Sequence, residues 1–235
     1  MSADTELYAI VGLGNPGDEY VRTRHNAGFW FVDRLADRGR ASPRRESKFH
    51  GEFARVKLGG AEVLLLKPST FMNRSGQAVQ ALAQFYKLSP DRILVAHDEL
   101  DLPAGTARLK LGGGHGGHNG LRDIHRALGE GYRRLRVGIG HPGDKTLVLN
   151  YGLGRPGRDD EAAIIAALDQ AADAVETWLS RNWDRAITQL HTQSKYTPSP
   201  RSWGVGWGEG LRLRSPSPRL SPVPGERGQG LKDSV

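Results

Sequence analysis

The chain has 235 residues and no cysteine, which excludes disulfide bonds, thiolate metal sites and a cysteine nucleophile. Residues 194–235 carry +4 of the net charge of +7, so the basic excess says little about residues 1–193. No apolar run reaches the roughly 20 residues of a membrane span, and the N-terminus lacks a signal-peptide pattern. We therefore expect a cytoplasmic protein.

Strand-length apolar runs and helix-length amphipathic segments alternate along residues 1–193. We expect strands at 7–12, 52–58, 61–67, 93–96, 107–111 and 135–140, and helices at 26–38, 75–88, 121–128 and 159–180, with a shorter helical segment to about His191. Gly59-Gly60 predicts a hairpin, whereas the basic stretch 38–48, which contains Pro43, is expected to be a surface connection. This order favours an α/β fold, with one globular domain over 1–193 and a twisted, mixed sheet flanked by helices.

Residues 194–235 differ in composition from the rest of the chain. They contain six of the 13 prolines, seven glycines and seven serines, with no apolar period. Such a segment cannot bury enough apolar surface to offset the entropy lost on ordering. We expect a disordered basic tail, in which Trp203 and Trp207 have no evident role.

Polar side chains recur just beyond predicted strands and in a glycine-rich stretch at 112–120. They are Asn15, His25, Asn73, Asp98 and Asn119. In an α/β sheet the carboxyl ends of the parallel strands share one edge, where ligands bind. One histidine, one carboxylate and three amides there predict a hydrolytic site. Because the chain lacks cysteine and a Gly-x-Ser-x-Gly turn, the expected nucleophile is water.

His25 lies in a polar stretch, and Asp98, which ends a buried strand, is its expected partner. A carboxylate that accepts a hydrogen bond from one imidazole nitrogen fixes the tautomer and makes the other nitrogen more basic. Glu99 and Asp101 are competing candidates for this role. Strand alternation places the side chain of His97 on the opposite face from Asp98.

Two patterns suggest cofactors. Gly12, Gly14 and Gly17 match a dinucleotide-binding fingerprint, but Pro16 lacks an N–H and no acid ends a second strand. The His115–His118 spacing is compatible with a metal, yet no further ligand lies nearby in the sequence. We therefore expect no metal and no cofactor. The N–H groups that begin the helix after residue 118 are instead expected to meet a phosphate or an ester carbonyl.

Six segments together resemble bacterial peptidyl-tRNA hydrolases, with the similarity running from about Leu7 to His191. These segments are 12–17, 23–28, 67–76, 97–101, 112–120 and 138–142. The resemblance implies a monomeric, cofactor-free enzyme that cleaves the ester between a peptide and the tRNA ribose, and that contacts the acceptor region of the tRNA. It implies His25 as the general base, oriented by Asp98, with Asn15 at the histidine or the substrate. It further implies substrate contacts from Tyr20, Phe71, Met72, Asn73 and Asn119, and tRNA contacts from Lys110, His118 and Arg136.

Two other classes of function stay open at this point. A nucleotide-dependent oxidoreductase needs an acid at the end of the second strand. A non-catalytic RNA-binding module has no need of the pair formed by His25 and Asp98.

Overall fold

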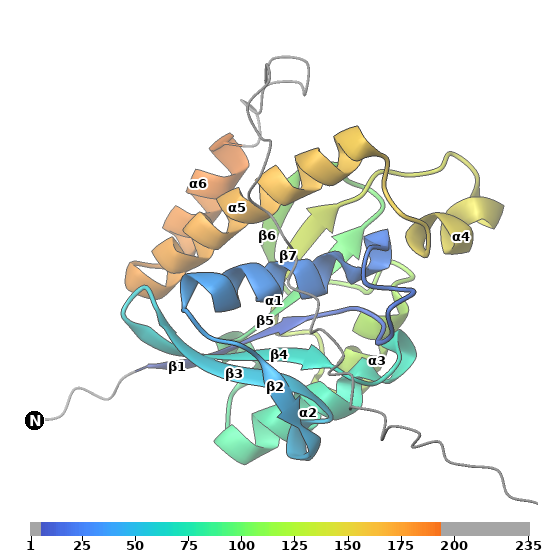
Figure 1. The fold of residues 1–235 in the computed structure, drawn as a ribbon. Helices are drawn as coiled ribbons and strands as arrows, with labels where there is room; N and C mark the ends of the chain where they lie inside the picture. Colours follow the sequence, from blue (N-terminus) through green and yellow to red (C-terminus); the bar gives the residue numbers. More distant parts are fainter. Residues whose placement is uncertain (1–5, 194–235) are drawn as a thin grey trace, which may run out of the picture. The chain divides into compact units, whose positions relative to one another are not determined.

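The computed structural model of the chain describes residues 6–193, which form one sheet with helices on both faces (Figure 1). The strands are β1 (Leu7–Gly12), β2 (Arg44–Glu46), β3 (Gly51–Leu58), β4 (Ala61–Pro68), β5 (Ile93–Glu99), β6 (Ala107–Leu111) and β7 (Arg133–Gly138). Their order is β2-β3-β4-β1-β5-β7-β6. The central strands β4, β1, β5 and β7 are parallel, whereas the β2–β3, β3–β4 and β6–β7 pairs are antiparallel. The predicted mixed α/β sheet is thus confirmed.

The helices pack in two layers with a hydrophobic core on each side of the sheet. The longer ones are α1 (Ala27–Arg38), α2 (Ser75–Tyr86), α3 (Asn119–Leu128), α5 (Arg158–Ser180) and α6 (Trp183–Gln193). The short helix α4 (Val148–Gly152) precedes the start of α5. Figure 1 shows α1, α5 and α6 over one face and α2 and α3 over the other. Single turns of 3-10 helix lie at 24–26, 47–49, 72–74, 90–92 and 145–147.

Several element boundaries differ from the prediction. The stretch 38–48 is not only a connection, because Arg44–Glu46 pairs with β3 as an edge strand. Edge strands are often short and carry charged side chains, so this strand lacks the apolar pattern by which a strand is recognised. The predicted helix at 75–88 ends at Tyr86, since Lys87 has a left-handed backbone with φ of 53°.

The strand ends and the start of α1 meet at one edge of the sheet. β1, β4 and β5 run in the same direction, so their carboxyl ends lie side by side. Gly28 lets α1 approach this edge, because a Cβ there would lie 2.4 Å from both the Ala96 oxygen and the Leu13 nitrogen. His25, three residues before Gly28, is thereby brought to the end of β5.

Two further expectations concern a membrane span and the C-terminal tail. Among residues 6–193, no helix combines the length and the apolar character needed to cross a bilayer. The predicted tail at 194–235, with Trp203 and Trp207, lies outside the described residues.

Candidate active site

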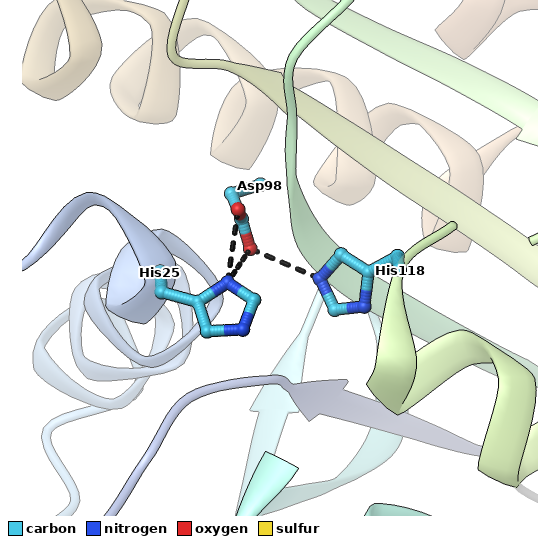
Figure 2. A group of neighbouring side chains, drawn as sticks. All are labelled: His25, Asp98 and His118. Carbon is cyan, nitrogen blue, oxygen red and sulfur yellow. Dashed lines mark hydrogen bonds and ion pairs between the residues drawn. The ribbon is translucent and has the colours of Figure 1, made fainter. Parts of the chain in front are cut away.

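Two imidazoles share one buried carboxylate at the end of β5 (Figure 2). His25 Nδ1 lies 2.9 Å from Oδ1 and 3.0 Å from Oδ2 of Asp98. His118 Nε2 lies 3.0 Å from the same Oδ1. The Asp98 side chain is 7% exposed and that of His118 9%, while that of His25 is 20% exposed. His25 is therefore the member of the group that solvent or a substrate reaches most easily.

The hydrogen bonds determine which nitrogen of each histidine carries a proton. His118 is the N-cap of α3, and its Nδ1 accepts from the backbone N–H groups of Gly120 and Leu121 at 3.2 Å and 3.4 Å. Nε2 of His118 therefore carries the proton and donates it to Asp98. His25 donates to Asp98 from Nδ1, so Nε2 of neutral His25 keeps a free lone pair.

The charges in this group favour an ionised Asp98. Burial alone would raise the pKa of Asp98, but the charges and hydrogen bonds of His25 and His118 outweigh it and lower that pKa. Burial alone would lower the pKa of His25, yet the charge of Asp98 and its hydrogen bond raise that pKa above the usual 6.5. Asp98 thus makes His25 a stronger base than a free histidine.

His97 stays neutral beneath this group. It faces the α2–α3 side of the sheet, as strand alternation predicts, and its ring centroid lies 5.2 Å from that of His118. Its Nδ1 donates to the Asp98 carbonyl at 2.8 Å. Burial lowers the pKa of His97 to about 3, so this ring adds no positive charge at neutral pH.

The cap of α3 corrects one expectation from the sequence. The backbone N–H groups of Gly120 and Leu121 donate hydrogen bonds to Nδ1 of His118 and do not point at a ligand. The helix start therefore does not supply these two donors to a phosphate or an ester carbonyl. It holds the imidazole of His118 against Asp98 instead. The local sequence also concealed the histidine and carboxylate that surround His118, because both come from distant segments.

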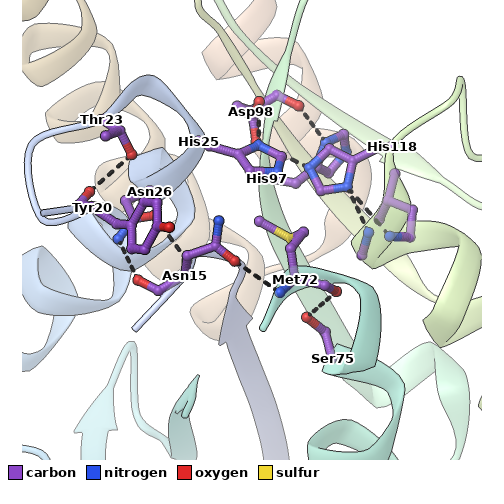
Figure 3. Close-up of polar contacts among 12 residues, drawn as sticks. Asn15, Tyr20, Thr23, His25, Asn26, Met72, Ser75, His97, Asp98 and His118 are labelled. Carbon is purple, nitrogen blue, oxygen red and sulfur yellow. Dashed lines mark hydrogen bonds and ion pairs between the residues drawn. The ribbon is translucent and has the colours of Figure 1, made fainter. Parts of the chain in front are cut away.

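A second network fixes the loop after β1 (Figure 3). The Asn15 N–H donates to Oδ1 of Asn26, and Nδ2 of Asn26 donates back to the Asn15 carbonyl, both at 2.9 Å. The side-chain oxygen of Asn15 accepts from the Met72 N–H at 2.9 Å. Because this oxygen is occupied, the amide NH₂ of Asn15 is the group left to face a substrate. This role of Asn26 has no local signal in the sequence.

A buried arginine ties the His25 turn to a segment far along the chain. The guanidinium of Arg24 donates to the carbonyls of Arg155 at 2.8 Å and Tyr151 at 3.4 Å. It also lies 4.0 Å from the centroid of the Tyr151 ring and 3.4 Å from Asp160. The backbone N–H of Arg24 donates to the Gly154 carbonyl at 3.1 Å. The turn that presents His25 is thus anchored through Arg24 on one side and through Asn26 on the other.

The other predicted substrate residues lie in the segments that follow β1 and β4 and at the start of α3. Met72 is buried at its floor, while Phe71 is 59% exposed and Asn73 and Asn119 are exposed. Tyr20 is partly buried, and its carbonyl accepts from the Thr23 hydroxyl. The structure therefore brings these residues to the same edge as His25, and their substrate contacts stay predictions.

Four cations form a block on one face of the β6–β7 pair. Ala107 and Leu109 in β6 and Leu135 and Val137 in β7 face the core under α5. The intervening residues face the other way, with Arg108 opposite Arg136 and Lys110 opposite Arg134. Like charges directly opposite each other destabilise a strand pair. Arg134 is 3% exposed, whereas Arg108, Lys110 and Arg136 are accessible, and an accessible cluster of cations is typical of a surface that binds anions.

The members of this cation block differ in their partners. Lys110 is exposed, whereas Nε of Arg136 lies 2.8 Å from Oε2 of Glu99. Glu99, a competing partner for His25 in the sequence, is thus engaged with Arg136. The predicted tRNA contacts of Lys110 and Arg136 lie on one basic surface. Both ring nitrogens of His118 are engaged, and its tRNA contact stays a prediction.

His25, Asp98 and His118 could also be considered as a metal site. Their three ligand atoms lie within 4.8 Å of one another, and in residues 6–193 no other group of histidines and carboxylates meets this condition. The separations between them are those of hydrogen bonds, however. Nε2 of His118 carries a proton, because Nδ1 is the acceptor for Gly120 and Leu121, and a protonated nitrogen cannot bind a metal. The group does not fit a metal in this arrangement.

The glycine turn after β1 does not form a dinucleotide site either. α1 begins at Ala27, well beyond Gly17, so no helix N-terminus follows the turn directly. Asp33, an acid within α1, pairs with Lys67 at 2.7 Å. The features that would favour a nucleotide-dependent oxidoreductase are therefore missing from this loop.

Comparison with known proteins identifies the family of this chain. A family model described as peptidyl-tRNA hydrolase matches residues 9–198. The crystal structure of the peptidyl-tRNA hydrolase from Acinetobacter baumannii is 47% identical, with a TM-score of 0.77, over 81% of this chain and 97% of that one. A peptidyl-tRNA hydrolase crystallised with N-propanol is 48% identical, with a TM-score of 0.75, over 78% of this chain and 94% of that one. The chain therefore belongs to the peptidyl-tRNA hydrolase family.

Proposed function

We propose that this chain hydrolyses the ester between the C-terminus of a peptide and the ribose of tRNA, with His25 as the general base. The observation that carries this proposal is the pair formed by His25 and the buried Asp98. Asp98 holds the proton of His25 on Nδ1, so the lone pair of Nε2 is available to take a proton from water.

Water is the nucleophile in this proposal because the nearby hydroxyl groups are engaged elsewhere. Within the described residues, His25 makes side-chain hydrogen bonds only to Asp98. The hydroxyls of Thr23, Thr70 and Ser75 each donate to a backbone carbonyl, at 2.8 Å, 3.1 Å and 2.8 Å respectively. Between residues 6 and 193, no serine or threonine is therefore paired with the base in the manner of a catalytic triad.

The proton moves from water to Nε2 of His25 as the oxygen attacks the ester carbonyl. The imidazolium that forms is stabilised by the charge of Asp98. We propose that His118 keeps Asp98 in place through its donated hydrogen bond. The imidazolium of His25 then gives this proton to the ribose oxygen as the ester bond breaks, so that free peptide and tRNA are released.

Amide groups are proposed to hold the substrate around this base. The NH₂ of Asn15 is the free donor on the floor of the site, since its oxygen accepts from Met72. The amides of Asn73 and Asn119 are exposed at the same edge. We propose that these donors bind the peptide backbone and stabilise the developing oxyanion.

The cation block on β6 and β7 is proposed to bind the tRNA. Phosphate contacts carry no sequence information, which suits an enzyme that accepts many tRNAs. Lys110 and Arg136 are the members assigned to this contact. A monomeric state and a cytoplasmic location stay predictions from the sequence.

Hydrolysis of a purified peptidyl-tRNA tests this function. We expect the wild-type chain to release tRNA and peptide, and His25→Ala to lower kcat by about 10²–10⁴-fold. Binding of deacylated tRNA should not change in the variant. His191→Gln serves as the matched control, because His191 lies on α6 and accepts from the Leu109 N–H, a role that glutamine can fill. Absence of hydrolysis by the wild type, with tRNA binding intact, would favour the non-catalytic RNA-binding alternative.

A further inference from the structure

Arg134 is a buried cation with no carboxylate partner among the described residues. Its side chain lies on β7 and the residue is 3% exposed. One terminal nitrogen donates to the Gly114 carbonyl at 2.7 Å, and the other donates to the Gly113 carbonyl and lies 2.9 Å from Nε2 of His125. The guanidinium thus connects β7 with the loop at residues 112–118, called the glycine loop below, and with α3.

His125 must be neutral to take part in this arrangement. Its Nε2 faces a permanently protonated guanidinium, so it can only accept, and the proton of the ring lies on Nδ1. Nδ1 is 3.6 Å from Glu130, and the rings of His115 and Tyr132 pack at 5.9 Å and 5.6 Å. Burial and the charge of Arg134 lower the pKa of His125, which keeps the ring in the accepting state at neutral pH.

The glycine loop joins two functional parts of the domain. At its start, Gly113 has φ of 96°, and a Cβ there would lie 2.8 Å from Nζ of Lys110. The ammonium of Lys110 therefore packs against the backbone of the loop. At its end lies His118, which donates to Asp98. A displacement of the loop would move both Lys110 and His118.

We propose that Arg134, with neutral His125 as its acceptor, is a positioning residue that holds the glycine loop so that Lys110 meets the tRNA and His118 meets Asp98. This proposal rests on the proposed function, because it assigns Arg134 a part in that reaction. Arg134 touches neither Asp98 nor His25 and acts through the loop alone.

The cost of this arrangement supports a positioning role. A buried charge without a counter-ion is expensive, and Nε of Arg134 is buried without a hydrogen-bond partner among the described residues. An apolar side chain would fill the same space at a lower cost. Only a planar group with several donors can hold two carbonyls and one imidazole at once.

Hydrogen exchange and steady-state kinetics together test the proposal. In Arg134→Lys the charge stays, but a lysine cannot hold all three acceptors. We expect faster amide exchange in residues 112–118, a higher KM through Lys110 and a lower kcat through His118, with kcat/KM reduced by about 10- to 100-fold. Arg133→Lys is the matched control, since Arg133 lies next in sequence but packs between Trp178 and Trp183. It should leave exchange in the loop and kcat/KM unchanged.

A second pair of variants tests the same contact through His125, in case Arg134→Lys does not fold. His125→Leu removes the acceptor and should loosen the loop, whereas His125→Gln supplies a carbonyl oxygen and should restore wild-type exchange and KM. Wild-type exchange in the loop for both Arg134→Lys and His125→Leu would overturn the proposal. A lower melting temperature without faster amide exchange in the loop would also overturn it. Exchange is measured without substrate, so failure of the wild type to cleave peptidyl-tRNA would refute the proposed function and leave this test in force.

Discussion

His118 and Asp98 are twenty positions apart in the sequence, yet Nε2 of His118 donates to Oδ1 of Asp98 at 3.0 Å. The same oxygen lies 2.9 Å from Nδ1 of His25. Two histidines with fixed tautomers therefore hold one carboxylate from both sides. The first two predictions below separate the effects of these two contacts.

Replacement of the carboxylate should move the pH profile as well as the rate. The pKa of His25 is raised by Asp98, so the wild-type base loses activity as the pH falls through a value above 6.5. In Asp98→Asn the charge is gone and burial dominates, so we expect the acid limb of kcat/KM to move to lower pH. Because an amide does not enforce the tautomer, the plateau should also fall by about 10²-fold or more.

The control for this prediction is Glu99→Gln, which changes the adjacent carboxylate. Glu99 is paired with Arg136, so the acid limb should not move. A shift in Glu99→Gln together with an unshifted Asp98→Asn would assign the orienting role to Glu99.

His118→Asn should separate the cap of α3 from the contact with Asp98. Asparagine is a favourable N-cap, so the melting temperature should stay close to that of the wild type. Its shorter side chain cannot reach Asp98, and the loss of a charge-assisted hydrogen bond of about 1.5 kcal/mol corresponds to a roughly tenfold lower kcat. His118→Ala should lower both quantities. An Asn variant with wild-type kcat would show that this contact does not contribute to the reaction.

Loss of single cations from the β6–β7 block should weaken tRNA binding more than catalysis. Lys110→Ala and Arg136→Ala should each raise KM and reduce the slope of log K against log salt by about 0.7–0.9. Arg136→Ala should have the larger effect, since it also leaves Glu99 unpaired beside the RNA. Adding Glu99→Gln to that variant should restore part of the affinity. Lys57→Ala, on β3 at the opposite end of the sheet from the site, should change neither value, and an unchanged slope in both block variants would place the tRNA elsewhere.

Chelation should leave the activity unchanged. Nε2 of His118 carries a proton toward Asp98, so a metal could enter only by displacing it. The enzyme is treated with EDTA, desalted and assayed with spermidine in place of magnesium, which keeps the tRNA folded. Activity that is lost and then restored by zinc, but not by magnesium, would contradict the metal-free mechanism.

Local patterns in the sequence were sufficient to predict the sheet and most of its helices. The apolar runs of β1, β4 and β5 and the Gly59-Gly60 hairpin require only neighbouring residues to be recognised. The edge strand β2 was missed because its three residues are polar and its partner, β3, supplies the pairing. The family resemblance supplied the predicted site residues, and the hydrogen bonds of the structure show which of their donors and acceptors are already engaged.

The role of His118 illustrates this limit. In the sequence it belongs to a glycine-rich stretch that suggests ligand binding by the backbone. In the structure the N–H groups of Gly120 and Leu121 donate to His118 itself, and its ring faces Asp98, which ends another strand. No spacing rule connects residues 98, 118, 125 and 134, because their contacts arise from the packing of α3 on the sheet. Arg134 takes part in this packing, and the contacts of Asn26 with the Asn15 backbone likewise arise only in the folded chain.

The tether of Arg24 has a consequence for how the protein is made. The turn that presents His25 is held by Tyr151, Gly154, Arg155 and Asp160, which are synthesised long after it. Domains generally fold as units, so this one folds only once the chain that forms it has left the ribosome. The base therefore reaches its fixed position only after Asp160 has emerged. Throughout its translation this chain is itself a peptide attached to tRNA, and for most of that time its own copy of the site is unassembled.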